Sequence, residues 1–205
     1  MSQSYADNIL SLYERHAQTW AKRRSNGFLE KAWLDVFIET LPDKESDRSV
    51  LDIGCGTGKP VALYLMEKGC SLTGVDGAAA MIAIASRAYS THRWIKADMR
   101  DMPLLDPFDG VIAWHSFFHL TPEDQRLMFE IFGRLCKPLA PLMFTSGTSL
   151  GEAIGEFEGE PLYHGSLDPQ EYRSLLDENG FEVLKHVEED PNCGQSTIWL
   201  ARKRA

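Results

Sequence analysis

The chain has few cysteines, no long apolar run and no cluster of positive charge. Only four cysteines occur in its 205 residues, and no two of them form a Cys-x-x-Cys pair. This distribution argues against a disulfide framework and against a zinc site. We therefore expect free thiols and a location in the reducing cytoplasm.

Membrane and export signals are equally scarce. No apolar run approaches the ~20 residues that a spanning helix needs. Residues 1–7 lack the positive stretch followed by an apolar one that is typical of a signal peptide. We expect no association with a membrane.

The charge balance is acidic. Thirty Asp and Glu oppose 21 Lys and Arg, which gives a net charge of −9. Binding of nucleic acid needs clustered Lys and Arg, and the run Arg202–Arg204 is short enough to be a solvated tail. We expect a small-molecule substrate and no nucleic-acid partner. Apolar residues at 43% and charged residues at 25% are typical of one globular domain, here residues 1–205. The oligomeric state stays open.

The most informative segment is Val50–Pro60, with the sequence Val-Leu-Asp-Ile-Gly-Cys-Gly-Thr-Gly-Lys-Pro. Its apolar start predicts a buried strand, and its three glycines predict a loop in which a ligand can approach bare backbone. The helix predicted next would turn unpaired N–H groups toward that loop. A second apolar run, 72–75, ends at Asp76, where a carboxylate can bind a ribose diol.

Three nucleotide-binding loops can be compared with this segment. The segment does not match the phosphate loop of NTPases, because no glycine stands five positions before Gly58 and Pro60 replaces the hydroxyl that would hold magnesium. The dinucleotide loop fits poorly, because its third glycine comes one residue early and Asp52 would repel a pyrophosphate. Asp52 would suit an ammonium group instead. The pattern that remains is Asp-x-Gly-x-Gly-x-Gly.

With this pattern the chain resembles the class I, Rossmann-like S-adenosylmethionine-dependent methyltransferases of the small-molecule type. The resemblance implies S-adenosyl-L-methionine as cofactor, with S-adenosyl-L-homocysteine as product. It also implies that Asp52 lies near the amino group of the cofactor and that Asp76 binds its ribose. The other residues implied to bind the cofactor are Gly54, Cys55, Gly56, Gly58, Gly77, Met81, Asp98, Met99, Trp114 and Tyr13, with Asp98 and Met99 at the adenine.

The predicted fold is α/β, a doubly wound and mostly parallel sheet with helices on both faces. The resemblance implies seven strands, the last two an antiparallel pair, and covers about residues 50–202. Apolar patterns predict strands at 50–53, 71–76, 93–97, 108–114, 142–145, 181–187 and 197–201. Helices are predicted at 60–68, 78–89, 124–135 and 168–179.

Two extra helices are predicted before the first strand, at residues 5–24 and 29–41, and would form an N-terminal helical cap over residues 1–45. In the first of them Tyr13, Ala17 and Trp20 share one face. Many members of the family carry such an aromatic helix folded over the cofactor. The alternative is a helix that only packs on the core.

Residues 147–165 differ in composition from the rest of the chain. They hold five glycines and four glutamates and follow the fifth predicted strand. We interpret them as a long acidic loop at the carboxyl edge of the sheet, serving either as a substrate lid or as a mobile surface loop.

Methyl transfer needs an acceptor held in line with the methyl group. It needs a general base only if the nucleophile keeps its proton. His115 and His119 follow the fourth strand, and His164 lies in the acidic segment, so each is a candidate base. Each could equally make a structural hydrogen bond. We therefore assign no catalytic residue, and no Asp/Glu/His spacing predicts a metal site.

Three functions are compatible with these features. The first, which we predict, is an enzyme that transfers a methyl group from S-adenosylmethionine to an unidentified small molecule. The second is a catalytically silent protein that binds S-adenosylmethionine or S-adenosylhomocysteine as a sensor or assembly partner. The third is a nicotinamide-dependent oxidoreductase, against which the early third glycine counts.

Overall fold

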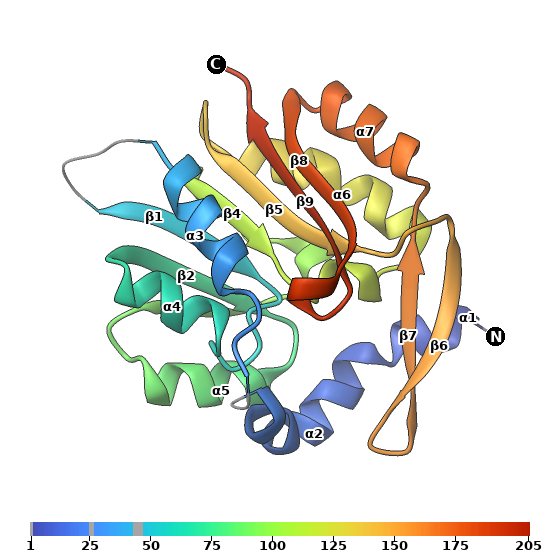
Figure 1. Ribbon diagram of the computed structural model, residues 1–205. Coiled ribbons are helices and arrows are strands. Elements are labelled where there is room, and N and C mark those ends of the chain that lie inside the picture. Colours follow the sequence, from blue (N-terminus) through green and yellow to red (C-terminus); the bar gives the residue numbers. More distant parts are fainter. Residues whose placement is uncertain (1, 25–26, 43–46) are drawn as a thin grey trace.

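The central feature of the computed structural model is a seven-stranded sheet with the strand order β3-β2-β1-β4-β5-β9-β8 (Figure 1). The structure describes residues 2–24, 27–42 and 47–205. The strands of the sheet are β1 (Arg48–Ile53), β2 (Cys70–Asp76), β3 (Arg93–Lys96), β4 (Gly110–Ala113), β5 (Pro141–Ser146), β8 (Phe181–Asp190) and β9 (Ser196–Lys203).

Strands β1 to β5 are parallel, and β9 runs antiparallel to both β5 and β8. The predicted seven-stranded, mostly parallel sheet with a closing antiparallel pair is confirmed. Strand β9 lies between β5 and β8, so β8 forms the edge.

Seven helices surround the sheet in the described part of the chain: α1 (Ser2–Asp7), α2 (Ile9–Arg24), α3 (Lys31–Thr40), α4 (Val61–Glu67), α5 (Ala79–Ala88), α6 (Pro122–Leu135) and α7 (Pro169–Glu178). Short 3-10 turns stand at Met99–Asp101 (η1), Phe117–His119 (η2) and Pro191–Cys193 (η3). Among these residues no helix is long and apolar enough to cross a membrane.

Helices cover both faces because successive side chains of a strand point to opposite sides. In β4, Val111 packs in the core that contains α6 and α7, while its neighbour Ile112 packs in the core that contains α3 and α4. Leu142 and Met143 of β5 divide in the same way. Strands buried on both faces are expected in a parallel sheet and explain why these segments are almost wholly apolar.

The N-terminal helices differ from the prediction in one respect. The single helix expected at residues 5–24 is interrupted at Asn8, whose N–H donates to the carbonyl of Tyr5 at 3.2 Å in a tight turn. Asparagine competes with helical backbone bonding, so a break at this position is reasonable. Three helices therefore precede β1 within residues 2–24, 27–42 and 47 onward. The boundary expected at residue 45 lies outside the described residues.

The prediction of a long acidic loop at residues 147–165 is wrong. This segment forms a hairpin of β6 (Gly151–Phe157) and β7 (Glu160–Ser166). Its two turn residues, Glu158 and Gly159, have φ of 55° and 79°, as the two-residue turns of twisted hairpins require. The many glycines concealed this pattern. Figure 1 shows the hairpin outside the main sheet, beside α1 and α2.

The base of the hairpin is fixed to the body by the buried side chain of Gln125 in α6. Its amide nitrogen donates to the carbonyls of Leu120 at 2.9 Å and Gly165 at 2.8 Å. Its oxygen accepts the hydroxyl of Tyr172 at 2.5 Å. One amide thus joins the residue that follows η2 to β7 and α7, and it satisfies three buried polar groups.

We predict that Gln125→Leu lowers the free energy of unfolding by at least about 2 kcal/mol, because buried polar groups lose their partner at ~1–3 kcal/mol each. Urea denaturation followed by circular dichroism measures this. Gln170→Leu, at an exposed position of α7, is the matched control. Equal stabilities of the two variants would show that the Gln125 bonds are not needed to fix the hairpin.

Candidate functional site

Two adjoining hollows lie at the carboxyl ends of β1, β2 and β4. The larger has a volume of about 780 Å³ and the smaller about 350 Å³. Of the residues predicted to bind a cofactor, those that line the larger hollow are Tyr13, Gly54, Gly56, Asp76, Gly77, Met81, Asp98 and Met99. Those that line the smaller are Asp52, Gly54, Cys55, Gly56 and Trp114. The two hollows share Trp20, Gly54, Gly56 and His115.

The glycine loop adopts a backbone that other residues rarely take. Gly54 has φ of 72° and Gly56 has φ of 53°. A side chain on Gly54 would collide with Ser116, whose Cβ lies 2.2 Å from the place of an added Cβ. Gly58 lines neither hollow, because it faces the rings of Trp94 and Tyr89. The structure therefore places Gly54 and Gly56 at the site, whereas Gly58 packs against two aromatic rings outside it.

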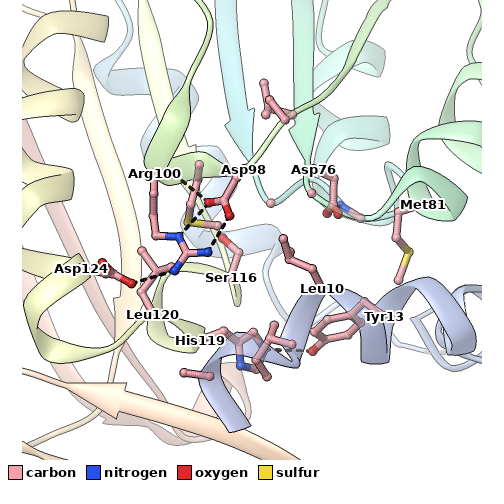
Figure 2. Close-up of a pocket in the computed structure, with 18 of the residues that line it drawn as sticks. Leu10, Tyr13, Asp76, Met81, Asp98, Arg100, Ser116, His119, Leu120 and Asp124 are labelled. Atoms are coloured by element: carbon pink, nitrogen blue, oxygen red, sulfur yellow. Dashed lines mark hydrogen bonds and ion pairs between the residues drawn. The ribbon is translucent and has the colours of Figure 1, made fainter. Parts of the chain in front are cut away.

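Asp76 joins the ends of the first two strands. One carboxylate oxygen accepts the N–H of Gly56 at 2.8 Å, and the other accepts the N–H of Ala78 at 2.8 Å. Burial raises the pKa of Asp76 to about 6, although these two hydrogen bonds oppose the rise. The carboxylate faces the larger hollow (Figure 2).

Asp52 and Trp114 bring unpartnered polar groups to the smaller hollow. Asp52 is 2% exposed, and its carboxylate makes no hydrogen bond with the described residues. Burial and the nearby Asp76 raise its pKa to about 7, while Arg24 acts in the opposite direction. The indole N–H of Trp114 is buried without an acceptor among the described residues. Buried groups of this kind cost free energy, so the arrangement favours a polar ligand that pairs with them.

Asp98 is held by a cation that the sequence did not indicate. Arg100 donates to Asp98 at 2.7 Å and to Asp124 at 2.9 Å (Figure 2). Burial alone would raise the pKa of Asp98, but the hydrogen bonds of Arg100 outweigh it and the pKa is lowered. Arg100 and Asp124 also line the larger hollow. Arg100 stands two residues after Asp98, but only folding brings Asp124 to it.

Helix α2 covers the larger hollow with Leu10, Tyr13 and Trp20. The hydroxyl of Tyr13 lies 2.9 Å from Nε2 of His119, and Nδ1 of His119 lies 2.7 Å from the carbonyl oxygen of Tyr163 (Figure 2 shows the first contact). A carbonyl only accepts, so Nδ1 carries the proton and Nε2 accepts from Tyr13. Burial lowers the pKa of His119 to about 3. His119 thus links α2 to the hairpin.

The tip of the hairpin packs on the same helix. The ring of Phe157 lies 5.9 Å from Tyr13 and 5.7 Å from Trp20, measured between centroids. Glu160 pairs with Arg15 and with His16, the latter at 2.7 Å. Segments more than 140 residues apart in the sequence therefore form one cover.

The three candidate histidines differ in their surroundings. His115 lines both hollows. His119 lines the larger one, but both of its nitrogens are occupied. His164 lies instead in a third hollow of about 900 Å³, between the hairpin and the end of β5, together with Phe118. Within the described residues, no group of three or more His, Cys, Asp or Glu is placed to hold a metal ion.

The fold and the site define a Rossmann-like protein with a nucleotide-type cleft at the carboxyl ends of its strands. Residues 50–139 match a family model described as "Methyltransferase domain". Among curated sequences, an O-methyltransferase of Pyrenophora dematioidea is 28% identical over 171 residues, which cover 78% of this chain and 62% of that protein. O-methyltransferase resE of Aspergillus sclerotiorum is 27% identical over 170 residues, covering 75% and 62%. The chain thus spans less than two thirds of the length of both relatives.

A solved structure supports the same grouping at the level of fold. The 1,6-didemethyltoxoflavin-N1-methyltransferase of Burkholderia thailandensis, with bound 1,6-didemethyltoxoflavin and S-adenosylhomocysteine, aligns with a TM-score of 0.75 at 18% identity. The alignment covers 100% of this chain and 91% of that one. The domain match covers residues 50–139, the two relatives are similar to this chain in sequence, and the solved structure shares its fold.

The buried Asp52 carboxylate makes stability depend on pH. An unfolded Asp has a pKa near ~3.9, and the folded value is about 7. The folded state holds this proton more tightly, so stability falls as pH rises from about 4 to about 7. We predict that Asp52→Asn is more stable than the wild type at pH 8 by at least about 1 kcal/mol, and that the difference vanishes near pH 4.

Urea denaturation at both pH values tests this in ligand-free protein. Asp106→Asn, at an exposed aspartate, is the control and should leave stability unchanged at both values. A destabilised Asp52→Asn variant at pH 8 would mean that the carboxylate is stabilised in the folded chain by a cation.

Proposed function

We propose that the chain transfers the methyl group of S-adenosylmethionine to a hydroxyl group of a small molecule. The observation that carries the proposal is the pair of joined hollows, with Asp76 in the larger and Asp52 in the smaller. S-adenosylmethionine has a ribose diol, which a carboxylate such as Asp76 can bind, and an ammonium group, which suits Asp52. It supplies an activated methyl group on a positively charged sulfur.

The polar groups without partners in the smaller hollow support this placement. The Asp52 carboxylate would accept from the ammonium group, and the Trp114 indole N–H and the Arg24 guanidinium would donate to the carboxylate of the amino-acid moiety. Arg24 is already paired with the buried Glu30 at 2.5 Å, which holds it in position. Asp98 and Met99 would hold the adenine at the far end of the larger hollow.

Helix α2 and the β6–β7 hairpin would act together as the lid over the cofactor. Tyr13 and Trp20 border the larger hollow, and Phe157 supports both rings from behind. Such a cover excludes water, which strengthens the electrostatic interactions inside the site. It would have to move for the cofactor to enter.

The third hollow would receive the acceptor. Among the described residues that line it, none is Lys or Arg, and the one acid, Glu152, already accepts the hydroxyl of Tyr163. The lining also includes Ser146, Thr148, Ser166, His164 and Phe118. This lining suits an uncharged molecule with hydroxyl groups and an apolar ring. The two fungal relatives support oxygen as the attacked atom, since both are named as O-methyltransferases.

Thermal unfolding with separate ligands tests the cofactor. A ligand at ~100 times its dissociation constant stabilises by ~2.7 kcal/mol, which is roughly a 5–10 °C rise for a chain of this length. We expect this rise with S-adenosylmethionine and S-adenosylhomocysteine, and none with NADH. A rise with NADH alone would favour the oxidoreductase. Release of S-adenosylhomocysteine with a panel of phenols then separates an enzyme from a silent binding protein.

Asp76 provides a residue-level test. We predict that Asp76→Ala weakens S-adenosylhomocysteine binding at least about tenfold, because hydrogen bonds to a charged group are worth ~1.5–3 kcal/mol. Isothermal titration calorimetry measures the affinity. Asp168→Ala is a matched control, since Asp168 accepts the N–H of Gln170 at 2.8 Å just as Asp76 accepts that of Ala78. Unchanged affinity in a folded Asp76→Ala variant would limit Asp76 to a structural role.

A further inference from the structure

The geometry points to His115 as the proton acceptor for the hydroxyl group that is methylated. This inference rests on the proposed function and adds the catalytic residue to it. It also restricts the acceptor to a nucleophile that keeps its proton until methyl transfer, as a hydroxyl does.

The position of His115 is the first argument. If Asp76 holds the ribose in the larger hollow and Asp52 holds the amino group in the smaller, the residues shared by both hollows border the sulfur between them. These are Trp20, Gly54, Gly56 and His115. His115 is the one member of that set whose side chain has a nitrogen lone pair that can accept a proton from a hydroxyl group.

The backbone of His115 is the second argument. Its φ is 50°, in the left-handed region that non-glycine residues rarely adopt. Such a conformation persists only where the surroundings impose it, and it is often found at functional sites. Here the N–H of His115 donates to Oγ1 of Thr145 at 2.9 Å. The ring is wedged between Trp114 and Phe118, with centroids 5.3 and 5.7 Å away.

The hydrogen bonds of the ring are the third argument. Nε2 lies 3.4 Å from Oγ of Ser196, so a proton on Nε2 can be donated to that hydroxyl. Nδ1 then keeps its lone pair and has no hydrogen-bond partner among the described residues. The two nitrogens of His119, in contrast, are both engaged, and His164 lines neither of the joined hollows.

Phe118 connects this residue to the third hollow. Its ring packs against His115 on one side and lies 5.2 Å from the ring of His164 on the other. An acceptor held in the third hollow would therefore present its reacting oxygen past Phe118 to His115. Phe118 is thus the residue that separates the third hollow from His115.

In the transfer, the acceptor oxygen forms a bond to the methyl carbon, and the carbon–sulfur bond breaks with its electron pair on sulfur. The hydroxyl proton passes to Nδ1 of His115. Burial lowers the pKa of His115 to about 4, so the ring is neutral at pH 7 and free to accept. The His115 ring becomes positively charged as the sulfonium loses its charge, so the total charge inside the covered site is unchanged.

The test uses sinefungin, which carries an amino group where S-adenosylmethionine carries its methyl sulfonium. If Nδ1 faces that position, His115→Phe should weaken sinefungin binding at least about tenfold relative to S-adenosylhomocysteine. His115→Asn should restore sinefungin affinity to within about threefold of the wild type, because its side-chain oxygen can replace Nδ1 and Asn tolerates positive φ. His186→Phe, at a position on β8 that lines none of the three hollows, should change neither affinity. Calorimetry at pH 8 gives all the values.

A second readout uses the wild-type chain and depends on no variant. In protein labelled with nitrogen-15 in histidine, sinefungin should shift the Nδ1 resonance of His115 more than S-adenosylhomocysteine does, and leave the His164 ring unmoved. Equal effects of His115→Phe on both ligands, with an unmoved Nδ1 resonance, would overturn the role of His115 alone. Failure of the wild type to bind S-adenosylhomocysteine would instead overturn the proposed function, and with it this inference.

Discussion

The interaction on which the site depends is the pair of hydrogen bonds from Gly56 and Ala78 to the carboxylate of Asp76. These bonds join the loop after β1 to the loop after β2, so the two strand ends that form the cleft keep one relative position. Because the bonds use backbone N–H groups, they require the unusual backbone of the glycine loop. Burial of the charged carboxylate costs free energy, as its raised pKa indicates.

A second constraint follows, since Asp52 lies close enough to Asp76 to raise its own pKa further. Two buried carboxylates without a full cation partner lower the stability of the ligand-free protein. Stored instability of this kind is common where a site is built to receive a charged ligand. Under the proposed function, the ammonium group and the sulfonium supply the missing positive charge. Asp52 and Asp76 then lower the stability of the ligand-free protein, and the same two carboxylates strengthen binding of the cofactor.

The cover over the cleft is made from two distant parts of the chain. Tyr13, Trp20 and Phe157 supply its apolar layer, and His119 joins the two parts through one hydrogen bond to each. Ion pairs at its rim are partly exposed, so they contribute little stability and can open easily. A firm apolar centre with a weak ionic rim suits an element that must close tightly and still release a product.

The sequence by itself determined the parallel sheet and the cleft, because both depend on local patterns. Apolar runs of four to seven residues followed by Gly or Asp indicate strand ends, and the carboxyl ends of parallel strands meet at one edge. The hairpin, the Asp98–Arg100–Asp124 bridge and the separate surroundings of His115, His119 and His164 were decided only by the tertiary structure. The bridge to Asp124 and the surroundings of the three histidines join residues distant in sequence, which composition and periodicity do not indicate. The hairpin pairs residues that are close in sequence, but its packing partners are distant. The glycines of β6 and β7 even favoured the wrong local structure, which long-range packing against α2 and α6 overrode.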